Sequence, residues 1–161
     1  MPRATSRIQS EIKQGRPFSS RQQEAGIALL RTADVLRRRI AQVIEPHGVT
    51  AQQYNVLRIL AGSGGEGLPT LEIAARMIER APGITRLLDR LEAKRLIRRE
   101  RCPSDRRQVL CWISESGLRL LKQMEGPIRQ ADHDALGGIR GSDLERLIEL
   151  LDGVRGEAKA G

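Results

Sequence analysis

The sequence predicts a mainly α-helical, α+β chain in which one β hairpin interrupts a series of helices. Apolar residues recur at three- and four-residue spacing through most of the 161 residues, which is the period of amphipathic helices. Segments 96–101 (LIRRER) and 108–114 (QVLCWIS) instead alternate like two strands joined by a short turn. Phenylalanine, tyrosine and tryptophan occur once each. The core must therefore be aliphatic.

The first part of the chain is expected to be a polar arm followed by a helix. Residues 1–20 are polar and basic, with Gly15 and Pro17 as helix breakers, and we expect a tail or a loosely docked arm. A helix is expected from about residue 21 to Glu45, where Pro46 and the residues after it stop it. Its apolar stripe is Leu29, Ala33, Leu36, Ile40 and Val43.

The next helix begins at Thr50, which forms a capping box with Gln53. It ends in residues 62–67 (GSGGEG), which match the dinucleotide fingerprint G-x-G-x-x-G. That fingerprint requires a strand before it and a helix after it, so we interpret this segment as a turn between helices. Thr70 is then expected to cap a short helix whose apolar positions are Leu71, Ile73, Ala74 and Met77.

A further helix is expected from near Arg80 to about Arg95. Pro82 fits in its first turn, where backbone donors have no intrahelical acceptor. The apolar stripe is Ile84, Leu87, Leu88 and Leu91, so the opposite face carries Arg86, Asp89, Arg90 and Ala93.

Two helices are expected after the hairpin. Ser114 should cap the first, which runs to about Leu136, and glycines at 137, 138 and 141 mark the next turn. Ser142 and Glu145 predict a capping box for the last helix. Its apolar face is Leu144, Leu147, Ile148, Leu151 and Val154.

The charge is unevenly distributed. Lysine and arginine number 28 against 20 acidic residues, for a net charge of +8. Residues 80–107 hold ten basic and four acidic side chains, whereas residues 108–161 hold seven and nine. The first segment therefore carries +6 and the second −2, which predicts a polyanionic partner for the first. A membrane helix would set one basic face against a bulky apolar face, and the scarcity of aromatic residues disfavours single-strand binding, so double-stranded nucleic acid is favoured.

Three short helices followed by a hairpin is the order of a winged helix-turn-helix, whose second helix of the turn enters the DNA major groove. Arg106 and Arg107 lie at the hairpin tip, where they could reach the negative potential of a narrow minor groove. Asp105 is expected to orient a neighbouring arginine through a charge-assisted bond. A solvated turn with ordinary surface arginines is the alternative.

The span from Thr50 to Gly117 resembles the MarR family of bacterial winged helix-turn-helix transcription regulators. The residues that carry the resemblance are ITRLLDRLEAKRLIRRE (84–100), SDRR (104–107) and ISESG (113–117), and the flanking helices extend it over about residues 21–155. The resemblance implies a homodimer, with the first helix and the last two at its interface, and a pseudo-palindromic double-stranded DNA operator. It also implies release, in many members, by a small phenolic or lipophilic effector or by oxidation.

On this basis we expect a basic N-terminal arm at residues 1–20, a helical dimerisation region at 21–48 and 115–158, and a winged helix-turn-helix DNA-binding domain at 49–114. An effector pocket would lie between the winged helix and the dimerisation helices. The expected function is that of a repressor released by a small-molecule effector. The alternative is a winged-helix protein-interaction module that does not bind DNA.

The resemblance also gives the expected DNA-binding residues. In ERAPG (79–83) this chain lacks the small hydroxyl residues usual in the family, so base readout would depend on Arg80 and Arg86. Arg95 stands where the family usually has glycine. Thr70 is a candidate phosphate contact through its backbone N–H. The complete set is Thr70, Arg80, Thr85, Arg86, Arg90, Arg106 and Arg107.

No enzyme chemistry, metal or cofactor is expected. The two histidines, His47 and His133, have no partners at metal or catalytic spacing. Cys102 follows Arg101, whose positive field would lower the pKa of the thiol, so a redox role is possible; the alternative is two ordinary thiols in a reducing cytoplasm. No apolar run is long enough to span a membrane, and the N-terminus does not resemble a signal peptide.

One basic cluster is left open by the sequence. Residues 36–40 read LRRRI on the first long helix. Solvation is the simplest explanation, and contact with a ligand or a DNA phosphate is the other.

Overall fold

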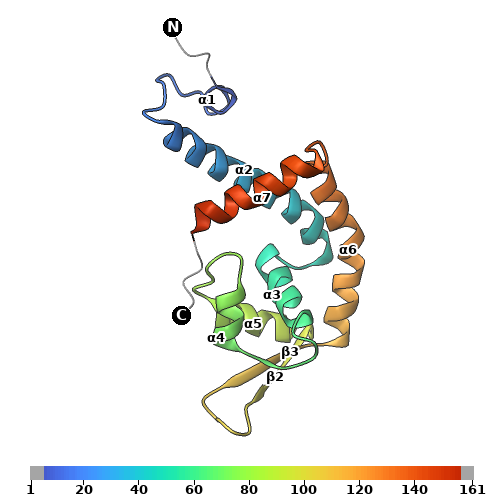
Figure 1. Ribbon diagram of the computed structural model, residues 1–161. Coiled ribbons are helices and arrows are strands. Elements are labelled where there is room, and N and C mark those ends of the chain that lie inside the picture. Colours follow the sequence, from blue (N-terminus) through green and yellow to red (C-terminus); the bar gives the residue numbers. More distant parts are fainter. Residues whose placement is uncertain (1–5, 157–161) are drawn as a thin grey trace.

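The computed structural model describes residues 6–156, and it has the expected series of helices interrupted by a hairpin (Figure 1). Three helices followed by a two-strand wing confirm the predicted winged helix-turn-helix, and long helices flank it on both sides. The elements are α1 (Arg7–Glu11), α2 (Arg21–Ile44), the 3-10 helix η1 (Glu45–His47), α3 (Ala51–Ala61), β1 (Leu68–Pro69), α4 (Thr70–Arg76), α5 (Ile84–Ala93), β2 (Ile97–Arg101), β3 (Val109–Ile113), α6 (Glu115–Leu136) and α7 (Gly141–Arg155).

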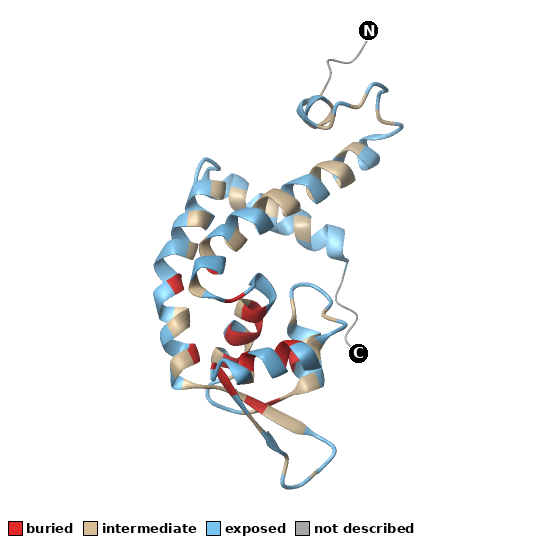
Figure 2. Ribbon diagram, turned by 180° about the vertical axis from the view of Figure 1, so that it is seen from behind, coloured by how far each residue is buried: buried red, intermediate tan, exposed pale blue. Residues whose placement is uncertain are grey.

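The buried core lies in the winged helix (Figure 2). The two long flanking helices contribute one buried aliphatic residue each, Ile44 from the end of α2 and Met124 from α6. These two side chains fix the winged helix to its helical support. The remaining core residues are Val49, Val56, Leu57, Leu60, Leu68, Ile73, Leu87, Leu88, Leu91, Leu96, Ile97 and Cys111.

The wing is an antiparallel pair in which β2 and β3 are in register from Ile97 opposite Ile113 to Arg101 opposite Val109. The sheet has a third strand that the sequence analysis missed. Leu68 of β1 lies opposite Cys111 on the other side of β3. A two-residue strand has no periodicity to detect, and its second residue is a proline, which is tolerated at a sheet edge.

Several helix caps agree with the prediction. Thr50 and Gln53 form a reciprocal capping box, in which the backbone N–H of each donates to the side chain of the other at 3.2 and 3.1 Å. Ser114 caps α6 by accepting from the backbone N–H of Gly117 at 3.1 Å. Its own hydroxyl donates to the carbonyl of Arg95 at 2.7 Å. The start of α6 is therefore tied to the end of α5.

Three predicted helix starts are wrong. Thr70 is the first residue of α4 and not its cap, because the extended residue before the helix is Pro69. The last helix begins at Gly141, so Ser142 lies inside its first turn, where Arg140 instead forms an ion pair with Asp143 at 2.9 Å.

The third correction concerns α5, which begins at Ile84 and not near Arg80. Pro82 disfavours a helical conformation for Ala81. The chain forms a turn closed by the Ile84 N–H and the Ala81 carbonyl at 3.1 Å. Arg80 is therefore in the segment between α4 and α5.

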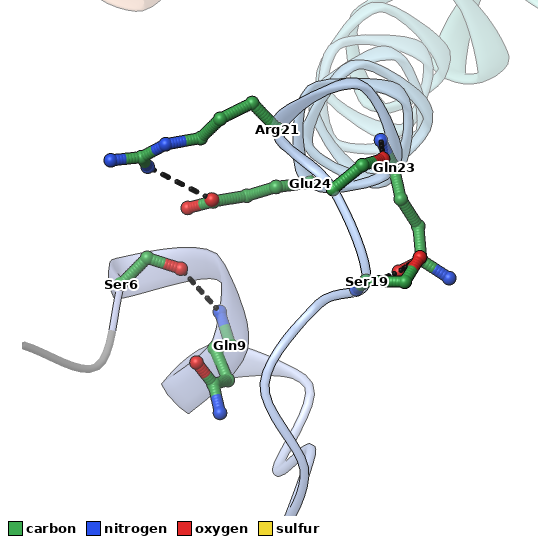
Figure 3. A network of polar contacts seen from close by, with 7 residues as sticks. Ser6, Gln9, Ser19, Arg21, Gln23 and Glu24 are labelled. Carbon is green, nitrogen blue, oxygen red and sulfur yellow. Dashed lines mark hydrogen bonds and ion pairs between the residues drawn. The ribbon is translucent and has the colours of Figure 1, made fainter. Parts of the chain in front are cut away.

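Part of the predicted N-terminal arm, residues 6–20, lies in the described chain. Residues 1–5 lie outside the described part of the chain, but Ser6 caps the one-turn helix α1, which packs against α2 (Figure 3). Ser20 caps α2 by accepting from the Gln23 N–H at 3.0 Å. The Gln23 side chain in turn accepts from the backbone N–H of Ser19 at 2.8 Å. These bonds fix the direction in which the chain enters α2.

The apolar faces of α2 and α7 are only partly buried within the described chain. Ile44 is the one buried residue of α2, and α7 has none in its whole length. On α7, Ile148 and Val154 are 53% and 68% exposed, and on α2 Leu30 is 71% exposed. Leu71, expected in the apolar stripe of α4, is also exposed, and Ile73 is the buried residue of that helix.

Candidate nucleic-acid interface

α5 presents a polar face with unpaired arginines. Its buried side is Leu87, Leu88 and Leu91, as the three- and four-residue spacing predicts. Thr85, Arg86 and Arg90 are exposed on the helix. Neither arginine side chain forms an ion pair or hydrogen bond with any residue between 6 and 156. Arg86 and Arg90 are one turn apart, so they lie on the same side of the helix.

The two acidic residues of α5 are both paired with one arginine of β2. The Arg99 guanidinium binds Asp89 at 2.7 Å and Glu92 at 2.6 Å. Hydrogen bonding to Glu92, with a smaller contribution from Asp89, raises the pKa of Arg99 against the opposing effect of burial. Asp89 was expected on the open face of the helix. It instead helps to attach α5 to the wing, and its negative charge is compensated.

The end of α5 explains the arginine found where the related family has glycine. Arg95 has a left-handed backbone with φ of 57°. Its N–H donates to the Glu92 carbonyl at 2.8 Å, and the Leu96 N–H donates to the Leu91 carbonyl at 3.0 Å. These two bonds form the Schellman motif that normally ends with glycine. The helix exit is retained, at the cost of an unfavourable backbone conformation for arginine.

The wing tip carries two further free arginines. Residues 102–108 form the turn, which is closed by the Cys102 N–H and the Gln108 carbonyl at 2.9 Å. Asp105 Oδ1 accepts from the backbone N–H of Arg107 at 3.0 Å, so Asp105 shapes the turn through an amide, where a guanidinium partner was expected. The side chains of Arg106 and Arg107 are exposed and have no partner in the described chain.

The strands of the wing carry arginines that are paired within the chain and one that is not. Arg98 lies over the ring of Trp112, 4.3 Å from its centroid, and also pairs with Glu100. Arg101 is exposed and unpaired within residues 6–156, and the sequence analysis did not single it out. Its position in the sequence, at the end of β2 and next to the wing turn, could have indicated it as a further DNA contact. Figure 1 places α4, α5 and the wing together in the half of the molecule opposite α1 and α7.

The other predicted site residues lie at the edges of this surface. Arg80 is exposed and unpaired in the described chain, before α5. Thr70 is half-buried at the start of α4, where a backbone N–H has no intrahelical acceptor. Its side chain lies close to the thiol of Cys111 and partly offsets the rise that burial causes in the pKa of that thiol.

The two thiols have different environments. Hydrogen bonding to Ser104, followed by the backbone of Asp105 and Ser104, lowers the pKa of Cys102. The sequence predicted that the pKa of Cys102 is lowered, and this is correct. The cause is hydrogen bonding to its neighbours, whereas the positive field of Arg101 was expected. Burial raises the pKa of Cys111, which is fully enclosed on β3. Both cysteines are free.

A cavity of about 410 Å³ separates the winged helix from the long helices. Three residues of LRRRI (36–40), Arg37, Arg38 and Ile40, line the cavity. Arg37 also binds Glu79 of the α4–α5 segment at 2.7 Å. The lining is Arg37, Arg38, Ile40, Ala41, Ala51, Gln52, Tyr54, Asn55, Arg58, Met77, Ile78, Glu79, Ile128 and Asp132.

Residues 6–156 contain neither a metal-binding cluster nor a membrane-spanning helix. No group of three or more histidine, cysteine or acidic residues is placed to hold a metal ion there. No helix in the same range is long and apolar enough to cross a membrane.

Comparison with known proteins gives consistent results. A model of the MarR family matches residues 47–108. A MarR transcription factor from Planctomyces limnophilus is 41% identical, with 84% of this chain and 98% of that chain covered and a TM-score of 0.66. CouR from Rhodococcus jostii RHA1, solved with p-coumaroyl-CoA bound, is 25% identical, with 89% and 100% covered and a TM-score of 0.74. Bordetella bronchiseptica BpsR shares the fold at 22% identity, with 88% and 99% covered and a TM-score of 0.76.

Proposed function

Because this chain belongs to the MarR family of transcription regulators, we propose that it is a homodimeric repressor that binds a pseudo-palindromic double-stranded DNA operator and is released by a small-molecule effector. The regions that we propose for these roles are the ones expected from the sequence. The winged helix at 49–114 would bind DNA, and residues 21–48 and 115–158 would form the dimer, although residues 157 and 158 lie outside the described chain.

The DNA-binding proposal rests on one observation: some arginines of this surface are paired within the chain, and others are not. Arg99 and Arg98 are used internally, by acidic residues and by Trp112. The expected DNA contacts at Arg86, Arg90 and the wing tip have no partner in residues 6–156. Free guanidinium groups on a recognition helix and on a wing suit base edges and phosphates. The proposed contacts remain Thr70, Arg80, Thr85, Arg86, Arg90, Arg106 and Arg107.

A salt titration of duplex binding tests this proposal. If about 8 phosphates are neutralised per dimer, the slope of log K against log salt is about −7. A slope shallower than about −2 would mean that the basic surface does not face DNA, and it would favour a winged-helix interaction module. The operator is expected to have half-site centres about 10 base pairs apart, so an isolated half-site should bind more weakly.

The dimer proposal is supported by the exposed apolar faces of α2 and α7. A helix such as α7, with an apolar stripe and no buried residue, is typical of an interface. Light scattering at micromolar concentration should give a dimer. Ile148→Glu should shift the mass toward the monomer, because Ile148 is 53% exposed and its replacement removes little from the fold of one subunit. Glu149→Gln, at the neighbouring exposed position, should leave the mass unchanged.

The effector proposal is supported by the cavity between the winged helix and the long helices, the place expected from the sequence. CouR was solved with p-coumaroyl-CoA bound, which supports a small-molecule effector in this chain as well. An upstream genomic fragment pulled down by the protein would supply the operator for such tests. Release from that fragment by a bound small molecule would support the proposal, and binding that no ligand alters would contradict its effector part.

A further inference from the structure

We propose that Arg101 binds the sugar-phosphate strand that separates the major groove contacted by α5 from the minor groove contacted by the wing tip. The inference rests on the DNA binding proposed above. It adds a residue outside the expected set of contacts, and it gives that residue a role that does not depend on base sequence. Arg98, on the same strand, has no such role.

The side chain of Arg101 leaves β2 on the face against which α5 packs. Successive residues of a strand point to opposite faces, so Ile97, Arg99 and Arg101 share one face. Ile97 is 3% exposed in the core, and Arg99 binds both acidic residues of α5. Arg101 follows on the same face, about 7 Å nearer to the wing tip. It is therefore the next basic side chain beyond the one that fixes the recognition helix to the wing.

The other face of β2 carries a basic residue that is already in use. Arg98 pairs with Glu100 and lies 4.3 Å from the ring centroid of Trp112, its register partner on β3. Glu100 is next to Arg101 in the sequence but points to the opposite face, so it serves Arg98. The strand thus presents one arginine with partners on its outer face and one without partners on its helix-facing side.

Arg101 has basic neighbours and no anionic partner. It is exposed, and no ion pair or side-chain hydrogen bond joins it to another residue in the range 6–156. Arg99 precedes it on the same face, with both α5 carboxylates already bound. The wing turn adds Arg106 and Arg107, which are also unpaired in that range. Like charges placed close together repel one another, and a phosphate bound among them would remove that repulsion.

The place of Arg101 between α5 and the wing tip selects the partner. Arg99 fixes α5 to β2, and the hairpin then extends beyond the helices to its turn at 102–108 (Figure 1). With α5 in a major groove and the tip in the adjacent minor groove, the sugar-phosphate strand between the two grooves crosses the stem of the wing. Among the strand residues 97–101 and 109–113, Arg101 is the one unpaired guanidinium on the helix-facing side.

A salt titration of duplex binding tests the assignment with Arg101→Gln and Arg98→Gln as a matched pair. Losing one phosphate contact in each subunit should change the slope of log K against log salt from about −7 to about −5 in the Arg101 variant. Arg98→Gln should keep the wild-type slope, because its side chain is on the other face of the wing. Arg101→Lys should also keep it, since lysine retains the charge. An unchanged slope in Arg101→Gln, or an equal change in both glutamine variants, would overturn the assignment.

Neutral methylphosphonate groups, placed one at a time along the duplex, locate the contact. The duplex is the one that the wild type selects from a random pool. A neutral group between the major groove of a half-site and its flanking minor groove should weaken binding of the wild type and of Arg98→Gln. Arg101→Gln should no longer respond at that position and should respond as the wild type does elsewhere. If Arg101→Gln keeps every response, or loses one at a different phosphate, Arg101 does not bind this strand.

Two further measurements separate a phosphate contact from other roles of Arg101. Binding-site selection with Arg101→Gln should return the wild-type sequence, because phosphate contacts carry no direct base preference. A changed base preference would mean that Arg101 reads a base. The melting temperature of Arg101→Gln without DNA should be no lower than that of the wild type, since the side chain has no partner within residues 6–156. A lower melting temperature would indicate an internal role and contradict the assignment.

The wild-type titration distinguishes failure of this inference from failure of the proposed function. If the wild type binds no duplex, the proposed function itself is wrong. If it binds with a steep salt slope and Arg101→Gln shares that slope, DNA binding stands, and only the assignment of Arg101 is lost.

Discussion

Arg99 of β2 binds Asp89 of α5 at 2.7 Å, and the same guanidinium holds Glu92 at 2.6 Å. Arg99 thereby offsets part of the negative charge of these two carboxylates, which lie on the same helix as Arg86 and Arg90. It also fixes the recognition helix to the wing, so the two expected DNA-contacting elements are held in one arrangement. Arg99 can therefore support DNA binding without touching DNA.

Arg99→Met should weaken duplex binding at every sequence. The substitution leaves Asp89 and Glu92 uncompensated, and their charge repels phosphates near the helix. We expect a loss of stability of about 1 kcal/mol, since Arg99 is largely covered but both carboxylates are partly exposed. Urea denaturation measures the stability, and fluorescence anisotropy with an operator duplex and an unrelated duplex measures the affinity.

A second substitution, added to Arg99→Met, tests whether Arg99 acts through its charge or by positioning α5. Adding Asp89→Asn removes one uncompensated carboxylate, so it should restore part of the duplex affinity. If the double variant binds no better than Arg99→Met alone, the charge argument is wrong, and Arg99 acts through position or through its own contact with DNA.

Gly117→Ala should strongly destabilise the fold. A Cβ at Gly117 would lie 2.4 Å from the carbonyl oxygen of Leu96 and 2.7 Å from Cγ1 of Ile113. The first of these atoms belongs to the backbone and cannot move aside cheaply, so we expect a loss of about 1–3 kcal/mol or more. Gly126→Ala in the same helix has open space and should be neutral or stabilising. Thermal denaturation of both variants gives the comparison, and equal melting temperatures would contradict it.

The parts of the fold that the sequence predicted are those with repeated apolar spacing or a matched pair of capping residues. The stripe Leu87, Leu88 and Leu91 is buried, and the Thr50–Gln53 capping box is present. The missed features have other causes. Ser142 and Glu145 have the spacing of a capping box, but α7 begins at Gly141 after the extended Arg140, so that spacing alone does not fix a helix start. β1 is too short to show alternation.

The candidate site was only partly predictable for a related reason. The free arginines of α5 follow from helical spacing, because the residues opposite a buried stripe are exposed. Partners that are distant in sequence do not follow from spacing. Arg37 and Glu79 are separated by the end of α2 and all of η1, α3 and α4, so only the folded chain brings them together. The same holds for Lys94, which donates to Gln53 at 3.3 Å.

Arg95→Gly should stabilise the protein by about 0.5–1 kcal/mol. The left-handed conformation at Arg95 costs about 1–2 kcal/mol for a residue with a Cβ, and glycine's greater freedom in the unfolded chain offsets part of the gain. Arg95→Ala keeps the Cβ and should change stability little. Urea denaturation of the two variants tests this, and a glycine variant no more stable than the alanine variant would show that the backbone there is unstrained.

Cys102 should react with iodoacetamide much faster than Cys111. Hydrogen bonding to Ser104 lowers the pKa of Cys102, and burial raises that of Cys111. The reactive form is the thiolate, so the Cys102 rate should rise with pH and level off at a lower pH than for an ordinary thiol. Mass spectrometry of the alkylated peptides measures both rates. Ser104→Ala should move the Cys102 profile to higher pH, and an unmoved profile would remove Ser104 as the cause.

The final prediction separates the two arginine sites of the proposed DNA surface. Arg86 on α5 would read base edges in the major groove, where all four base pairs differ, whereas the wing would reach the minor groove or the backbone. Arg86→Ala should therefore cost ~1–3 kcal/mol and relax preference at one or two positions of each half-site. Arg106→Ala combined with Arg107→Ala should weaken binding to all sequences and reduce the salt slope, with any sequence effect confined to A·T-rich flanks.

Binding-site selection on both variants decides between the two roles, with the wild type selected in parallel. Arg146→Ala on α7 provides a control, since its side chain pairs with Glu149 of the same helix, far along the chain from the wing and α5. It should leave both the selected sequence and the salt slope unchanged. If the wing variant instead loses preference at the central half-site bases while Arg86→Ala keeps it, the wing reads the bases. The assignment of α5 as the recognition helix would then be wrong, because its free arginines would be serving only phosphates.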